Sequence, residues 1–251
     1  MRFERNRQDV GRIPQTGDKF SGIGGADAYT KLLLHFNGDA KDDSLVSRPV
    51  NVLKCTIDAA QSKFGEYSAK FVAASKEYIA IPDHDDFYFL GNFTIDCWLR
   101  FATLPTGTGG AMVFYGGYQD SSNFQYACLR NDGSNNYDWQ ANASAGGTPC
   151  YSGLQRANPK PVVNQWYHVA IVRTGNDWMI FQDGVQIGST ATDTDPMPNI
   201  TTPFCIGYIG LAASTAYFNG WIDEFRVSKG IARWTGNFTP PTRPYTRKNW
   251  E

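Results

Sequence analysis

Residues 93–101 constrain the fold more than any other segment, because apolar and polar side chains alternate there with a period of two. Successive side chains of a β-strand point to opposite faces of a sheet, so the alternation predicts a long strand with one face in a protein core. The face expected in the core carries Phe93, Ile95, Cys97, Leu99 and Phe101. The opposite face carries Thr94, Asp96, Trp98 and Arg100.

Other short apolar segments recur along the chain and are separated by turns. Asp183 and Gly184 mark the clearest turn, since an Asp-Gly pair between alternating segments is typical of a β-hairpin. Residues 131–161 are rich in turn-forming residues, and no segment has helical periodicity for longer than one turn. About a dozen strands in one block therefore predict an all-β fold with two packed antiparallel sheets.

The strand-forming segments define one domain over residues 30–240. Residues 1–29 lack strand alternation, are rich in Arg and Gly, and are expected to form an extended N-terminal arm that docks on a neighbouring subunit. Residues 241–251 are expected to form a Pro-rich C-terminal tail, because proline cannot extend a sheet.

Composition excludes several classes of protein. The 23 Lys and Arg residues stand against 24 Asp and Glu, whereas a general nucleic-acid binder needs a basic excess, so no nucleic-acid partner is expected. No run of about 18 apolar residues exists, so membrane insertion is not expected. The N-terminus is polar, which predicts that no signal peptide is present. The odd number of cysteines, five, predicts buried, reduced thiols in a protein made in a cytoplasm.

The order of several short motifs resembles the laminin-G-like, concanavalin-A-like jelly-roll domain, in the version found in phage structural proteins. Each motif is weak alone, but the series is specific for the fold. The resemblance implies a jelly-roll sandwich, and it leaves function open because this fold hosts lectins, adhesion modules, glycosidases and structural domains. The matching segments are residues 32–38, 62–65, 78–82, 93–98, 166–170, 181–185, 218–226 and 230–234.

The same resemblance implies a structural Ca²⁺ ion near the end of the first strand and in the last strand. The positions that match the family's ligands are Asn37, Asp43 and Asp223, of which Asn37 replaces a family aspartate and removes one charge. Ca²⁺ takes six to eight oxygen ligands, which carboxylates and backbone carbonyls supply. The alternative is that these residues only bond the backbone at turns and strand ends.

An enzymatic function is not expected. Catalytic relatives of this fold carry a Glu-x-Asp-x-x-Glu strand motif, which this chain lacks. Asp223 and Glu224 are adjacent, so they are expected to point to opposite faces of a strand and cannot act as a catalytic pair.

Carbohydrate binding uses exposed aromatic rings as stacking platforms beside amides that bond hydroxyl groups. Candidates lie in segments expected to be loops, with Trp139 at a junction between loop and strand. The alternative is that Trp139 only caps the sandwich core. The candidate glycan-binding residues are Tyr118, Asn135, Asn136, Tyr137, Trp139 and Tyr151.

These observations favour a non-enzymatic surface protein of a phage virion, such as a head decoration, fibre or tail accessory protein. The expected protein is made in the host cytoplasm, is attached to other virion subunits through residues 1–29, and forms a homo-oligomer in the assembly. Its loops are expected to present aromatic and amide side chains to host-surface polysaccharide. The alternatives are a soluble carbohydrate-binding lectin and, less favoured, a divergent glycosidase.

Overall fold

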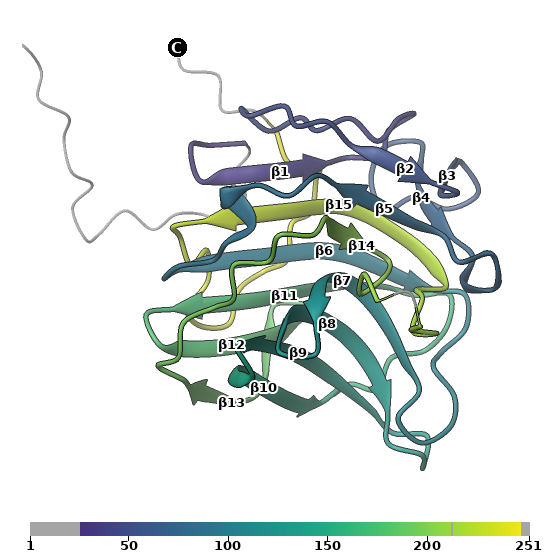
Figure 1. Cartoon of the computed structure of the whole chain (residues 1–251). Helices are drawn as coiled ribbons and strands as arrows, with labels where there is room; N and C mark the ends of the chain where they lie inside the picture. The colour runs from purple at the N-terminus through teal and green to yellow at the C-terminus, as the bar shows by residue number, and fades with distance from the viewer. Residues whose placement is uncertain (1–25, 212, 247–251) are drawn as a thin grey trace, which may run out of the picture.

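The computed structural model describes residues 26–211 and 213–246. Most of the predicted arm and the last residues of the predicted tail therefore lie outside the described residues. The described chain forms two antiparallel sheets packed face to face, which confirms the two-sheet jelly-roll sandwich (Figure 1). Its helices are two single 3-10 turns, η1 (Ala73–Ser75) and η2 (Asp85–Phe87), and no described helix is long and apolar enough to cross a membrane.

One sheet has eight strands in the order β13-β12-β11-β6-β15-β4-β3, and β1 also pairs with β15. Its strands are β1 (Thr30–Leu34), β3 (Thr56–Asp58), β4 (Ser68–Phe71), β6 (Phe93–Phe101), β11 (Trp166–Thr174), β12 (Asp177–Gln182), β13 (Val185–Thr192) and β15 (Gly220–Lys229).

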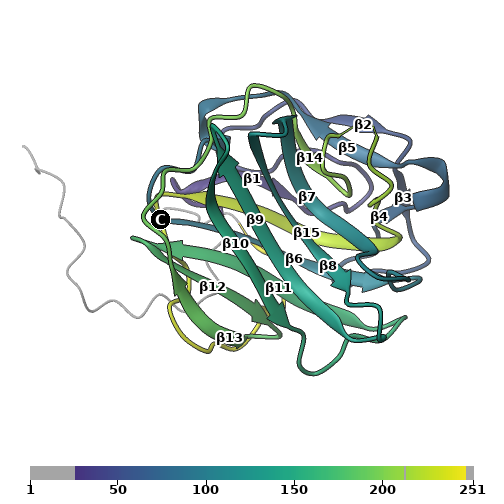
Figure 2. The same ribbon diagram turned by 60° about the horizontal axis from the view of Figure 1, so that its bottom comes forward.

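The second sheet has seven strands in the order β10-β9-β8-β7-β14-β5-β2. Its strands are β2 (Asn51–Leu53), β5 (Tyr78–Ile81), β7 (Ala111–Asp120), β8 (Asn123–Asn131), β9 (Tyr137–Ala145), β10 (Thr148–Arg156) and β14 (Phe204–Ile206). Figure 2 shows β7–β10 lying obliquely across the strands of the eight-stranded sheet. Residues 131–161, expected to be rich in turns, thus contain two whole long strands, β9 and β10.

The core lies between the sheets and is built from the faces that the period-two pattern predicts. The apolar face of β6, from Phe93 to Phe101, belongs to one large apolar cluster, and its side chains are at most 1% exposed. Burial of this much apolar surface is the main favourable contribution to folding. All five cysteines are free thiols, and only Cys55 is partly exposed, as the odd count predicts.

The outer face of the eight-stranded sheet is covered by the chain that follows β15. Trp234 and Phe238 stack with their ring centroids 3.9 Å apart and pack on Ala170 and Phe181 of that face. From the segment between β3 and β4, Lys63 lies over the Trp98 ring, with its Nζ 3.8 Å from the ring centroid. The sheet therefore has a second, smaller apolar layer outside the main core.

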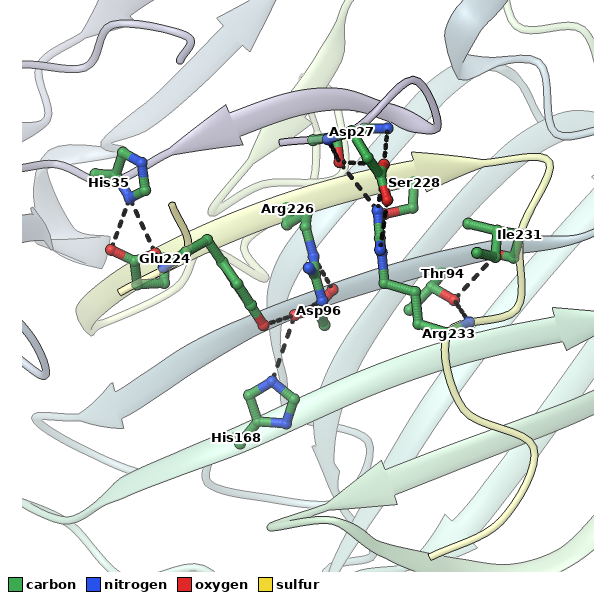
Figure 3. Close-up of polar contacts among 12 residues, drawn as sticks. Asp27, His35, Thr94, Asp96, His168, Glu224, Arg226, Ser228, Ile231 and Arg233 are labelled. Carbon is green, nitrogen blue, oxygen red and sulfur yellow. Dashed lines mark hydrogen bonds and ion pairs between the residues drawn. The ribbon is translucent and has the colours of Figure 1, made fainter. Parts of the chain in front are cut away.

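A fully buried ion pair lies under this covering layer. The Arg226 guanidinium donates from Nε to Asp96 Oδ1 over 2.9 Å and from Nη2 to Asp96 Oδ2 over 3.2 Å (Figure 3). His168 Nε2 lies 3.4 Å from Asp96 Oδ2, and Asp96, His168 and Arg226 are all 0% exposed. Burial raises the pKa of Asp96, but Arg226 and His168 outweigh burial and hold that pKa well below its usual range.

Tyr245 covers the ion pair between Asp96 and Arg226. Its hydroxyl donates to Asp96, its backbone N–H donates to Glu224 Oε2 over 2.9 Å, and Arg226 lies 3.8 Å from its ring centroid. Tyr245 is 2% exposed. Residues 241–246, expected to belong to a tail, are therefore packed on the sandwich. Ala26 and Asp27 of the predicted arm are packed there too, because Ala26 shares a buried apolar cluster with Tyr245 and Arg233 Nη2 donates to Asp27 Oδ1 over 2.9 Å.

The expectation that Asp223 and Glu224 point to opposite faces is wrong. A β-bulge interrupts β15 between Asp223 and Arg226, and Glu224 has a left-handed backbone with φ 49°. Asp223 stands opposite Trp98, and Glu224 bonds Tyr245, so both carboxylates lie on the outer side of the eight-stranded sheet. The extra residue of a bulge breaks the alternation on which the expectation rested.

Replacement of Arg226 by methionine should lower the free energy of unfolding by about 3–5 kcal/mol, because it leaves the Asp96 carboxylate buried without a counter-charge. Lys41→Met breaks the exposed contact with Asp43 and should cost less than about 1 kcal/mol. The double variant Asp96→Asn/Arg226→Met should recover part of the loss. Urea denaturation measures all three, and equal losses for Arg226→Met and Lys41→Met would contradict the assignment.

The ion pair also predicts acid sensitivity. Because the pKa of Asp96 is lower in the folded than in the unfolded chain, its contribution is fully present above the ordinary value of 3.8 and is lost as pH falls below it. The Asp96→Asn/Arg226→Met double variant lacks this titration and should lose less stability between pH 4 and pH 2. Urea midpoints measured across this range test the expectation, and equal slopes for the two proteins would count against it.

Candidate functional site

The outer face of the seven-stranded sheet carries half-exposed aromatic and amide side chains. The strand register places Tyr118 of β7 opposite Phe124 of β8, and Tyr126 of β8 opposite Asn142 of β9. The Tyr118 and Phe124 rings stack with centroids 6.3 Å apart, and Asn142 Nδ2 donates to the Tyr126 hydroxyl over 3.2 Å. Each of these four side chains is partly exposed, so they form a row of stacking and hydrogen-bonding groups on one face.

A groove of about 680 Å³ continues this row toward β5 and β2. Tyr118 belongs to both features, because it stacks on Phe124 and also lines the groove. The Tyr78 and Tyr208 centroids lie 5.1 Å apart, and Tyr208 stacks on Tyr217 at 4.4 Å, which fixes the Tyr208 ring in the wall. The groove is lined by Val50, Asn51, Tyr78, Ala80, Tyr118, Thr202, Pro203, Cys205, Tyr208 and Gly210.

One wall of the groove lies directly on β7 because β7 has glycine at position 116. A Cβ atom at Gly116 would lie 2.7 Å from the Ile209 Cα atom, closer than real contacts allow. The loop that follows β14 therefore packs against the strand and brings Tyr208 and Gly210 beside Tyr118. The other wall and the floor come from alternate residues of β5 and β14, whose remaining residues Ile79, Ile81, Phe204 and Ile206 lie in the core.

The groove is neutral. Burial raises the pKa of the Tyr78 hydroxyl, burial and the Tyr217 hydroxyl raise that of Tyr208, and burial raises the pKa of the Cys205 thiol to about 12. Each of these groups is therefore protonated at neutral pH and able to donate a hydrogen bond. The arrangement combines flat apolar rings with uncharged polar groups, which suits a ligand with both apolar faces and hydroxyl groups.

Three of the predicted aromatic candidates lie in the core of the structure. Trp139 is 0% exposed and donates from Nε1 to Gln182 Oε1 over 2.7 Å. Tyr137 is 6% exposed, and Tyr151, at 4%, stacks on Trp178 with centroids 4.4 Å apart. Buried rings cannot stack on a ligand in this conformation. Trp139 lies in the main core cluster itself rather than only capping the sandwich.

The remaining predicted residues lie on the surface. Tyr118 lines the groove, whereas Asn135 and Asn136 are exposed in the turn between β8 and β9 and are not among the lining residues. Asn136 Nδ2 donates to Asp132 Oδ2 over 3.0 Å, and Asn135 has φ 58°, so both shape the turn.

Sequence reasoning missed Tyr78, Asn51 and Tyr208. A signal existed for Tyr78, because it alternates with the apolar core residues of β5 and therefore points outward. Asn51 lies in a three-residue strand and Tyr208 in a loop, and neither segment has a pattern that indicates a surface site. Their assembly depends on the pairing of strands that are distant in sequence.

The calcium candidates lie near one another but are occupied with other contacts. Asp223 Oδ2 accepts hydrogen bonds from the backbone N–H groups of Lys63 and Phe64 over 2.7 and 3.1 Å, and Oδ1 accepts from Glu224 N–H over 2.9 Å. Asp43 contacts Lys41, and Asn37 lies against Gly65.

The donor set is therefore weak for a cation. No group of three or more His, Cys, Asp or Glu side chains suited to a metal ion occurs in residues 26–211 and 213–246. Burial raises the pKa of Asp223 to about 7, which also disfavours a charged carboxylate there. Calcium binding at Asn37, Asp43 and Asp223 stays a prediction, and calorimetric titration with CaCl₂ tests it.

The neighbouring histidine contacts the same cluster. His35 Nδ1 lies 2.8 Å from Glu224 Oε1. Burial lowers the pKa of His35, but the hydrogen bond and charge of Glu224, with the charges of Asp43 and Asp223, outweigh burial and raise it. Glu224 thus bonds His35 and Tyr245, and it holds the segment around Tyr245 against the sheet.

Solved structures with a similar fold include domains of an arabinanase, a mosquitocidal protein and a neurotoxin. Domain 4 of AbnA, a GH43 extracellular arabinanase from Geobacillus stearothermophilus solved with arabinotriose, has a TM-score of 0.58 and 20% identity, over 81% of this chain and 93% of that one. The binding domain of Paraclostridial Mosquitocidal Protein 1 has a TM-score of 0.63 and 14% identity, over 82% and 50%. The botulinum neurotoxin serotype D ligand binding domain with N-acetylneuraminic acid has a TM-score of 0.59 and 15% identity, over 82% and 48%.

At these identities the likeness shows the fold alone, and this chain spans about half of each toxin chain. No curated protein sequence matches the chain. A family model described as the concanavalin A-like lectin/glucanases superfamily matches residues 73–232, which is more than half of the sequence. This range includes β5 to β15 and most of the lining of the groove. The chain belongs to the concanavalin A-like lectin/glucanases superfamily.

Proposed function

We propose that this protein is a non-enzymatic carbohydrate-binding module whose ligand lies on the outer face of the seven-stranded sheet. The observation that carries this proposal is the groove lined by Tyr78, Tyr118 and Tyr208, which continues the row of Phe124 and Tyr126. Aromatic rings pack against the C–H faces of sugars, and the neighbouring hydroxyl and amide groups bond sugar hydroxyls.

The position of the groove also favours this face. The segment that carries Trp234, Phe238 and Tyr245 covers part of the outer face of the opposite sheet. The half-exposed Trp221 of that sheet has the cationic side chains of Lys70 and Arg100 over its ring. The similar domains from AbnA and from botulinum neurotoxin serotype D, solved with arabinotriose and N-acetylneuraminic acid, are consistent with a sugar as the ligand class.

Binding is favoured over hydrolysis by the distribution of carboxylates. Glycoside hydrolysis needs two carboxylic groups beside the scissile bond, and the lining of the groove contains none. The adjacent carboxylates Asp223 and Glu224 lie on the other sheet, at 0% and 1% exposure, and accept hydrogen bonds from the backbone.

Deployment on a phage virion remains part of the proposal. Its support is the motif series shared with phage structural proteins and the basic residues 1–12, which suit attachment to other subunits. Deletion of residues 1–25 should abolish incorporation into the parent particle and leave a folded domain, since the described fold begins at Ala26. Electrophoresis of purified particles measures incorporation. Normal incorporation of the truncated chain would contradict attachment through the arm.

Tyr118→Ala should weaken glycan binding about tenfold, equivalent to about 1.4 kcal/mol, because it removes the ring shared by the aromatic row and the groove. Tyr29→Ala is a matched control, since Tyr29 is 42% exposed and lies outside the groove. A glycan array identifies the ligand, isothermal titration measures affinity, and circular dichroism confirms folding. Unchanged affinity in Tyr118→Ala would contradict the groove as the binding site. Absence of any glycan signal from the wild-type protein would contradict carbohydrate binding.

A further inference from the structure

Because the lining of the groove carries no charged side chain, we infer that its ligand is an uncharged oligosaccharide rather than a sialylated or uronic-acid glycan. The inference rests on the proposed function and names the ligand class of the same site. It concerns the face where Tyr118 stacks on Phe124 and where Tyr78, Thr202 and Tyr208 line the groove.

The first argument is the absence of charge. None of the ten side chains that line the groove is Asp, Glu, Lys, Arg or His. A sugar carboxylate that leaves water must regain its lost hydration from a cation or from several hydrogen-bond donors, and a site without a cation makes this transfer costly. A sugar hydroxyl exchanges one neutral hydrogen bond for another and carries no such cost.

The second argument is that the titratable groups of the lining stay uncharged at neutral pH. The phenols of Tyr78 and Tyr208 and the thiol of Cys205 have raised pKa values because burial disfavours their charged forms. They therefore offer neutral donors and acceptors, and none of them becomes an anion that would repel or attract a charged ligand.

The third argument is the shape of the lining. Ala80 and Cys205 are small and buried, while Tyr78 and Tyr118 are half-exposed. Thr202 Oγ1 donates to the Tyr118 carbonyl oxygen over 3.0 Å, which orients this hydroxyl oxygen as an acceptor. At about 680 Å³ the groove lies within the ordinary size range of small-ligand sites, roughly 300–1,000 Å³.

The test compares charged with uncharged probes. A glycan array with the full chain should give its groove-dependent signals on neutral glycans, where a groove-dependent signal is one that Tyr118→Ala abolishes. Titration with arabinotriose and lactose, against N-acetylneuraminic acid and 3′-sialyllactose, gives affinities for defined probes. The affinity for the best neutral glycan should change less than twofold between 50 and 500 mM NaCl, because surface electrostatic attraction is screened by salt.

A gain-of-function variant makes the test independent of which neutral glycan binds best. Thr202→Lys places an ammonium group in the lining and should raise the signal of acidic glycans at least fivefold. Thr201→Lys is the matched control, because Thr201 is the exposed neighbour outside the lining and should leave that signal unchanged.

The outcomes separate the inference from the function on which it rests. Groove-dependent, salt-insensitive signals on neutral glycans support both. Groove-dependent signals on sialylated or uronic-acid glycans overturn the inference and leave the proposed function standing. Absence of any glycan signal, or signals that Tyr118→Ala leaves intact, overturns the proposed function and the inference together.

Discussion

The buried pair of Asp96 and Arg226 is the constraint on which the rest of the structure depends. Two charges at 0% exposure on the outer face of a sheet must be shielded from water and supplied with further hydrogen bonds. His168 and Tyr245 supply these bonds, and Tyr245 reaches the pair only because the chain after β15 returns across the sheet. The last described residues are therefore held on the eight-stranded sheet, and the protein itself covers that face around the ion pair.

While this segment covers part of the eight-stranded sheet, the outer face of the seven-stranded sheet stays available for binding a ligand. On the seven-stranded sheet, Gly116 lets the loop after β14 approach β7, and this contact forms a wall of the groove rather than a lid over the whole face. Tyr78 and Tyr118 come from strands that also carry core residues, so these two rings are positioned by the same packing that stabilises the fold. A site on strands is more precisely held than one on loops.

The sequence patterns predicted the sheets well because the alternation of apolar side chains is local information, as in β6. They predicted the site poorly because the groove joins β2, β5, β7 and β14, and only pairing in three dimensions brings these strands together. Trp139 was expected near a loop because turn residues surround it, yet Ala141 and Ala143 continue its alternation and place it in a core strand. The bulge at Glu224 could not be predicted from the sequence, because the surrounding residues have the pattern of a regular strand.

The central claim is that the open face of the seven-stranded sheet binds the ligand and that the covered sheet does not. The most direct measurement is amide chemical-shift mapping by NMR during titration with the best-binding oligosaccharide. The account predicts that the largest perturbations fall on the amides of Tyr78, Tyr118 and Thr202. Perturbations concentrated on His168, Arg226 and Trp234, or on the turn that carries Asn135, would contradict it.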